Sequence, residues 1–343
     1  MKKRGLILLL PILAFALAAV AMAAWHDMQA DRALAHQPGA QMSARPPPPS
    51  VGGGAFKESA SDADWPQNAP TPEQVMYAQP DLLGREAARL KARTPGKVNL
   101  HAIVFAGDGS QNVFRNEAEY FNKLFSRRFD AAGHVMVLEN NLTSLTTRPL
   151  ATWTNLEDAL DAVASKMDPA QDILLLYFTT HGSKDHTLLV DMDPLPLDQI
   201  GAADLPDILA EHPFKHKVVI INACYSGGFI PPLAGAGTMV ITAARSDRSS
   251  FGCGEQSELT WFGHAFLVDA LDKTDDLRRA FRIARDEVAR WERRDHYEPS
   301  DPQISVGRGI AAQLARWRDG FTPGSAVSFT PAPPSTIPTG TVQ

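Results

Sequence analysis

The chain has 343 residues, enough for one large domain or two ordinary ones, and 44% of them are hydrophobic, so a sizeable core can form. Its formal net charge of −6 argues against a general nucleic-acid binder, which usually presents a basic face. Its two cysteines, Cys224 and Cys253, are too few for a disulfide framework or for a zinc site of four thiolates.

The first 24 residues have the features of a targeting segment. Basic residues stand at positions 2–4, and the run from Gly5 to Ala24 carries no charge. The sequence AMA at 21–23 fits a signal cleavage site. Residues 1–24 are therefore predicted to be a signal peptide or an uncleaved membrane anchor. The rest of the chain is expected to be exported, either to the periplasm or anchored to the inner membrane facing the periplasm.

Residues 25–96 are predicted to be a largely disordered linker rich in proline and glycine. Within it, RPPPPSVGGG (Arg45–Gly54) combines extended prolines with flexible glycines, and only Asp81–Arg93 has helical character. One folded domain is predicted over residues 97–320. The residues from 321 to 343 are rich in Pro, Ser and Thr and are predicted to form a disordered tail.

Apolar strands alternate with amphipathic helices along the predicted domain. In chain order, strands are predicted at 98–105, 134–140, 172–178, 187–190, 217–222, 238–243 and 303–306, and helices at 116–129, 155–167, 197–211, 260–271 and 275–293. Continuous apolar strands such as DILLLYF (172–178) are typical of strands buried on both faces. The pattern predicts an α/β fold with a mostly parallel central sheet of about six strands, covered by helices on both faces.

Two of these strands run into residues that can carry chemistry. His181 and Gly182 follow the strand at 172–178, and Cys224 follows the strand at 217–222. Ligands of such sheets bind beyond the carboxyl ends of the strands, so the two side chains share one edge if the strands are neighbours. A thiolate is a strong nucleophile, and imidazole can carry its proton at physiological pH. The backbone N–H groups of Gly182 and Cys224 offer two donors for an oxyanion.

The two segments YFTTHGS and IINACYSGG resemble the paired catalytic motifs of the legumain-type C13 cysteine peptidases, which belong with the caspase-like peptidases. The resemblance covers about Val98–Gly307, and its later segments are similar to bacterial members. It implies a caspase-like fold and a cysteine endopeptidase that works through a thioester acyl-enzyme. It also implies that Cys224 is the nucleophile, that His181 is the general acid/base, and that Gly182 and Cys224 supply the oxyanion N–H groups.

The same resemblance implies a substrate pocket formed by Arg115, Asn222 and Thr260. Arg115 looks like the basic residue of the family's pocket, whereas Asn222 and Thr260 stand where the family carries acidic residues. The pocket is therefore expected to have kept its positive group and lost its acids. This favours an acidic residue at P1, the position before the cleaved bond. Asn112 stands one position out of register for a residue that would orient His181.

These motifs call for no cofactor, and the spacing of His186, Asp191 and Asp193 fits no metal site. A peptide or protein is the expected substrate, and no nucleic-acid partner is expected. A membrane contact is expected only through an uncleaved segment 1–24. Two alternatives stay open: a catalytically silent caspase-fold module tethered at the membrane, and a transpeptidase- or transamidase-like enzyme, because the same acyl-enzyme can be passed to an amine. Cys253, in a Gly-Cys-Gly loop, is interpreted as a free or regulatory thiol.

Overall fold

The computed structural model describes residues 65–254 and 257–331. The predicted signal or anchor at 1–24, most of the predicted linker and the end of the predicted tail lie outside these residues. Within the two described ranges, no helix is both long enough and apolar enough to cross a membrane.

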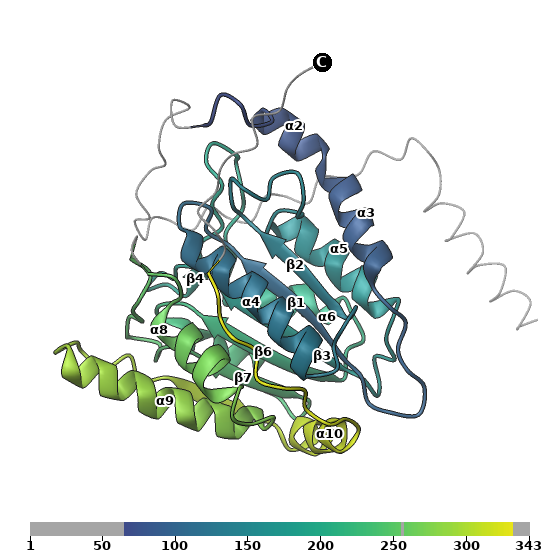
Figure 1. Ribbon diagram of the computed structural model, residues 1–343, viewed down its shortest axis with the longest axis vertical. Helices are drawn as coiled ribbons and strands as arrows, with labels where there is room; N and C mark the ends of the chain where they lie inside the picture. Colours follow the sequence, from purple (N-terminus) through teal and green to yellow (C-terminus); the bar gives the residue numbers. More distant parts are fainter. Residues whose placement is uncertain (1–64, 255–256, 332–343) are drawn as a thin grey trace, which may run out of the picture. The chain divides into compact units, whose positions relative to one another are not determined.

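A six-stranded sheet forms the centre of the described part (Figure 1). Its order is β2-β1-β3-β6-β7-β8, and every neighbouring pair is parallel except β7 with β8. The strands are β1 (Leu100–Ala106), β2 (Val135–Glu139), β3 (Ile173–Thr179), β6 (His216–Asn222), β7 (Thr238–Thr242) and β8 (Gln303–Val306). A separate antiparallel pair joins β4 (Thr187–Leu188) to β5 (Ile200–Gly201). The predicted mostly parallel sheet of about six strands is confirmed.

Helices pack on both faces of this sheet, as predicted. One face carries α4 (Asn112–Arg128), α8 (Trp261–Gly263), the π-helix η3 (His264–Ala270), α9 (Leu277–Arg294) and α10 (Arg308–Asp319). The other face carries α3 (Gln79–Arg89), α5 (Trp153–Ala164), α6 (Asp204–Ala210) and α7 (Ile230–Leu233). Two short helices, α2 (Pro72–Tyr77) and the 3-10 helix η2 (Ser226–Phe229), complete the set in the described ranges.

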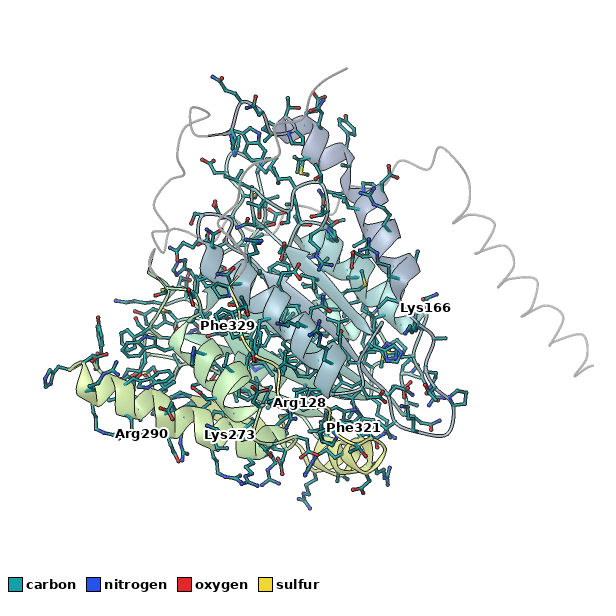
Figure 2. All side chains as sticks on the ribbon, in the orientation of Figure 1. Arg128, Lys166, Lys273, Arg290, Phe321 and Phe329 are labelled. Carbon is teal, nitrogen blue, oxygen red and sulfur yellow. The ribbon has the colours of Figure 1, made fainter. Side chains whose placement is uncertain are left out.

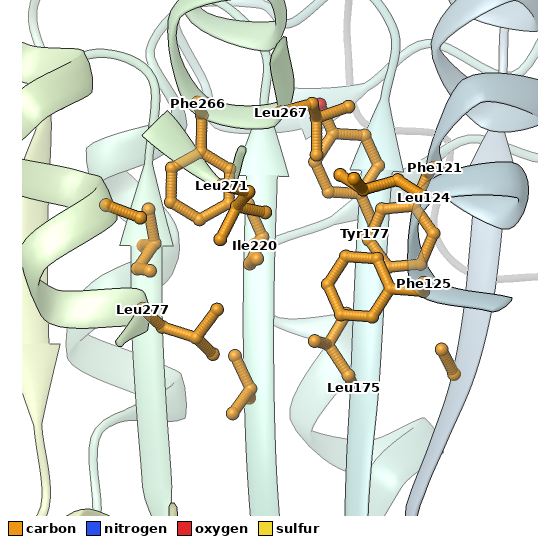
Figure 3. Packing of buried hydrophobic residues seen from close by; sticks show 14 of the residues in the cluster. Phe121, Leu124, Phe125, Leu175, Tyr177, Ile220, Phe266, Leu267, Leu271 and Leu277 are labelled. Carbon is orange, nitrogen blue, oxygen red and sulfur yellow. The ribbon is translucent and has the colours of Figure 1, made fainter. Parts of the chain in front are cut away.

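Successive residues of the central strands enter opposite cores. In β3, Leu175 and Tyr177 join the core beneath α4 and α9, whereas Leu174 and Leu176 join the core beneath α5 and α6. This is the two-residue period of a strand, and because both faces are covered the sequence shows an unbroken apolar run. Figure 3 shows the aromatic side chains of α4 packing over the first face.

The predicted linker 25–96 extends too far toward the folded domain. Its last third forms α2 and α3, and Leu83 and Leu90 are buried in the core beneath α5. Thr71 caps α2 in a capping box with Gln74, and Gln79 accepts a hydrogen bond from the N–H of Leu150 at 2.8 Å. Apolar side chains spaced along one helical face therefore outweigh the local proline content.

The predicted disordered tail also begins too early. Val327 is buried, its N–H donates to Asp272 at 3.0 Å, and its carbonyl accepts from the Tyr120 hydroxyl at 2.7 Å. Phe321 and Phe329, labelled in Figure 2, pack against the core beneath α4. The segment from 321 to 331 therefore crosses the surface of α4 as part of the domain, held by apolar anchors that a composition rich in Pro, Ser and Thr conceals.

The helix predicted at 197–211 is shorter in the structure. Pro206 lies in the first turn of α6, where its missing N–H removes no intrahelical hydrogen bond. The Asp204 carboxylate accepts from the N–H of Gly201 at 2.8 Å, and Gly201 belongs to β5. The proline and the acidic side chain together set the point where the helix begins.

His101 is a fully buried histidine on β1. Its ring stacks on that of His134 with centroids 4.3 Å apart, and neither of its ring nitrogens has a hydrogen-bond partner among residues 65–254 and 257–331. Burial, together with a smaller effect of the neighbouring His134, lowers the pKa of His101 to about 4. The folded state therefore prefers the neutral ring.

We predict that His101→Phe removes part of the acid sensitivity of the fold. The folded pKa lies below the unfolded value near 6.5, so wild-type stability should fall as pH drops from 6.5 toward 4, by up to about 3 kcal/mol from this group. Urea unfolding of both proteins at several pH values measures the effect. Two free-energy curves that stay parallel from pH 7 to pH 4 would contradict the prediction.

Candidate active site

Three neighbouring parallel strands end in register at one edge of the sheet. Ala106 of β1 pairs with Thr179 of β3, and Thr179 pairs with Asn222 of β6. His181 and Cys224 each stand two residues beyond their paired strand ends. The structure therefore brings the predicted base and the predicted nucleophile to the same edge on adjacent strands.

The backbones of Gly182 and Cys224 touch at this edge. A Cβ atom placed on Gly182 would overlap the carbonyl oxygen of Cys224. Gly182 also forms a bridge to Leu188, which ties the segment after β3 to the small β4–β5 pair. Only glycine permits this approach, so the two residues predicted to supply oxyanion donors lie in direct contact.

The Cys224 thiol is half-buried and faces the backbone of Ser250. The N–H of Ser250 donates to Cys224 Sγ at 3.2 Å, and the Ser250 carbonyl oxygen lies 3.5 Å from the same sulfur. An N–H donor directed at sulfur stabilises negative charge there. Immediately after the cysteine, Tyr225 adopts a left-handed conformation with φ 56°, and its N–H donates to Arg248 at 2.7 Å, so the chain turns sharply away.

His181 is packed between an aromatic ring and a carboxylate. Its Nε2 lies 3.4 Å from Oδ2 of Asp108, and the Phe114 ring meets the imidazole edge-on with centroids 5.1 Å apart. Burial lowers the pKa of His181, and the charge of Asp108 opposes that change. The imidazole is therefore held neutral by its surroundings while a buried anion stands beside one of its nitrogens.

Asp108 is the site residue that sequence reasoning missed. It is 1% exposed and lies two residues beyond Ala106, the same offset that His181 and Cys224 have from their own strands. The strand-end rule that identified the other two applies equally to Asp108. The side-chain oxygen of Asn112 accepts a hydrogen bond from Asn141 at 3.1 Å, so its partner is Asn141 and not His181.

A buried carboxylate lies beneath the strand ends. Glu117 on α4 is fully buried, and its oxygens accept hydrogen bonds from Asn222 Nδ2 at 2.7 Å, Thr179 Oγ1 at 2.6 Å, Tyr177 Oη at 3.0 Å, Thr260 N at 2.8 Å and Thr260 Oγ1 at 2.6 Å. Asn222 also donates to Thr260 Oγ1 at 2.8 Å. Burial raises the pKa of Glu117, and the donors counteract part of this increase.

Glu117 is a buried acid beside Asn222 and Thr260 that the sequence did not lead us to expect. Asn222 and Thr260 are brought together as predicted, but both are buried and both donate to Glu117. Arg115 is half-buried and lies about 200° around α4 from Glu117. Burial and the charge of Glu119 raise the pKa of Glu139, at the end of β2, to about 7 against smaller opposing effects that include the charge of Arg115. Arg115 therefore interacts with Glu139, whereas Asn222 and Thr260 bind Glu117.

The second cysteine has a different environment. Cys253 is half-buried and packs against the core beneath α4. Burial, with smaller contributions from the nearby Cys224, Glu117 and Asp108, raises the pKa of the Cys253 thiol to about 11. In residues 65–254 and 257–331, no group of three or more His, Cys, Asp or Glu side chains is placed to hold a metal ion.

This geometry agrees with one finding from known proteins. Residues 154–313 match the model of the Peptidase C13 family. The matched segment contains His181, Gly182, Cys224 and Thr260, and it begins after Asp108 and Glu117. The match supports a cysteine-peptidase type of function acting on peptides or proteins. No curated protein matches the chain.

We predict that Gly182→Ala disrupts the site. The added methyl group would overlap the Cys224 carbonyl oxygen, which is backbone and can yield only if the strand ends move. The expected result is at least a tenfold slower modification of Cys224 by an electrophile, with about 1–3 kcal/mol of destabilisation.

Gly84→Ala is the matched control for this substitution. Gly84 lies exposed within α3 with no heavy atom near an added Cβ, so alanine should stabilise the protein by about 0.5–1 kcal/mol. Rate and denaturation measurements on both variants provide the comparison. Equal, small effects at the two glycines would rule out the close approach at Gly182.

Proposed function

We propose that this chain is a cysteine endopeptidase in which Cys224 is the nucleophile and His181 carries the proton. The observation that supports it best is the shared register of β3 and β6, which leaves both side chains two residues beyond the same sheet edge. Fold alone does not decide function, so the proposal rests on this pairing of thiol and imidazole.

In the proposed reaction, His181 takes the thiol proton and the Cys224 sulfur attacks the carbonyl carbon of a peptide bond. The C–N bond then breaks, and His181 returns the proton to the leaving amine. A water molecule, deprotonated by His181, hydrolyses the resulting thioester and frees the thiol. The backbone N–H of Ser250, 3.2 Å from the sulfur, would stabilise its negative charge before attack.

The proposed oxyanion hole consists of the N–H groups of Gly182 and Cys224. No residue of the described ranges accepts a hydrogen bond from either N–H, and the two backbones are in contact. Two unused backbone donors on residues in contact suit an oxygen that gains negative charge during attack. In other hydrolases a single such donor contributes about 2.7–4 kcal/mol to transition-state stabilisation.

The proposed substrate preference rests on Arg115, Asn222 and Thr260. Arg115 favours an acidic P1 residue, whereas the carboxylate of Glu117 beneath Asn222 and Thr260 opposes one. Because Asn222 and Thr260 are buried, their proposed role is to shape the floor of the pocket from below. A peptide or protein is the proposed substrate, with no cofactor and no nucleic-acid partner.

We further propose that the chain acts outside the cytoplasm, in the periplasm or anchored to the inner membrane facing it. The basic start and the uncharged run up to Ala24 support export. Fractionation of a bacterial host expressing the full chain should recover it outside the cytoplasm. Mass analysis then separates a chain cut after Ala23 from an intact anchor, and recovery in the cytoplasm would refute the export.

We predict that the full chain reacts with a peptidyl acyloxymethyl ketone at Cys224. Peptide mass mapping should find the adduct there, and His181→Ala should reduce the labelling rate by about 10²–10⁴-fold, the range for general acid–base catalysis. A set of probes with Asp, Glu or Asn at P1 measures the preference. A faster rate with Asn than with both acidic probes would disprove the acidic P1 preference.

Cys253→Ser is the matched control, because it removes the other cysteine. It should leave the labelling rate of Cys224 unchanged, since burial keeps the Cys253 thiol protonated at neutral pH. Labelling of Cys224 no faster than that of a free peptide thiol would indicate a silent module instead of a peptidase.

A further inference from the structure

We propose that Asp108 is a positioning residue for His181, which makes the site a Cys224–His181–Asp108 arrangement. The inference rests on the proposed function, because Asp108 acts only through the histidine. It is supported by the three in-register strand ends, each followed two residues later by one of these side chains. No other carboxylate in the described ranges lies within 4 Å of a His181 ring nitrogen.

The Asp108 carboxylate is rigidly held. Its Oδ1 accepts from the N–H of Ser110 at 2.8 Å, which leaves Oδ2 directed at His181. The backbone on either side is tied to Asp191: the N–H of Gly109 donates to the Asp191 carbonyl at 2.9 Å, and the N–H of Asp191 donates to the Gly107 carbonyl at 2.8 Å. A side chain fixed in this way can orient its partner without first losing conformational freedom.

Burial strengthens the electrostatic interaction between Asp108 and His181. Asp108 is 1% exposed and the His181 side chain is 26% exposed, so water screens their interaction only weakly. Phe114 restrains the imidazole from a second direction. With Nε2 and its proton facing Asp108, Nδ1 is the nitrogen left to exchange a proton with the thiol. A carboxylate beside Nε2 also stabilises the imidazolium that forms when the thiol is deprotonated.

Other titratable groups surround this pair. Cys224 follows β6, Asp191 precedes β5, Glu117 projects from α4, and Cys253 lies in the segment before α8. Asp191, which forms a backbone bridge with Asp108, is the alternative carboxyl to compare. Burial raises the pKa of Asp191, and the charges of Asp108 and Asp193 also contribute to this increase. Its carboxylate is not within 4 Å of a nitrogen of the His181 ring.

The test compares Asp108→Asn with wild type, His181→Ala and Asp191→Asn in the full chain. Asparagine keeps the shape and can still accept from the Ser110 N–H, but its amide loses the charge and can present hydrogens to Nε2. With the peptidyl ketone, Asp108→Asn should lower the labelling rate of Cys224 at least tenfold. The alkaline limb of the pH–rate profile should move down by at least about one pH unit. Asp191→Asn should stay within about twofold of wild type.

A second variant guards against a folding defect. Asp108→Ala with added formate should recover part of the rate, whereas Asp108→Asn should not respond, because a merely structural lesion is not repaired by a small carboxylate. NMR titration of the His181 ring in Cys224→Ala should show a lower pKa once Asp108→Asn is added.

The outcomes are distinguishable. If His181→Ala slows labelling while Asp108→Asn keeps the wild-type rate and pH profile, the Asp108 inference fails and the proposed peptidase stands. If His181→Ala itself changes nothing, the proposed function fails and the role of Asp108 fails with it. An unchanged His181 titration in the Asp108→Asn protein would also overturn the inference.

Discussion

Parallel, in-register pairing of β1, β3 and β6 is the constraint on which the rest of the site depends. Each strand rises about 3.3 Å per residue, so a slip of one residue would displace a strand end by that distance and turn its side chains to the opposite face. The pairs Ala106–Thr179 and Thr179–Asn222 remove this freedom. Strand pairing alone therefore brings Asp108, His181 and Cys224, which are far apart in sequence, to one edge of the sheet.

Glu117 holds the same strand ends from below. Its partners Thr179 and Asn222 stand two residues before His181 and Cys224, and Thr260 belongs to the segment that leads into α8. A carboxylate held by neutral donors pays a desolvation penalty, which is why its pKa is raised despite five hydrogen bonds. We interpret this cluster as a device that fixes position, since an apolar side chain in the same space would leave the donors free and the strand ends untied.

The parts of the molecule that could be predicted are those whose signal is local. The alternation of apolar strands and amphipathic helices predicted the sheet, and two short motifs placed His181 and Cys224 at strand ends. The position of Glu117 depends on contacts made across more than 100 residues, as with Asn222, and no local pattern encodes them. The helix expected at Asp81–Arg93 forms as α3, but its packing against the domain through Leu83 was not predicted, and the segment after Gly320 was mistaken for disordered chain because its composition hid apolar anchors such as Val327.

The surroundings of the two cysteines differ in ways that favour the proposed role of Cys224. Cys253 packs against the core, and burial together with nearby negative groups disfavours its thiolate. Cys224 stands at the sheet edge with the Ser250 N–H directed at its sulfur, and its strand neighbour carries the imidazole. A backbone donor thus acts on one sulfur, whereas the core surrounds the other. In the proposed mechanism, the register that aligns β3 and β6 is therefore also what distinguishes Cys224 from Cys253.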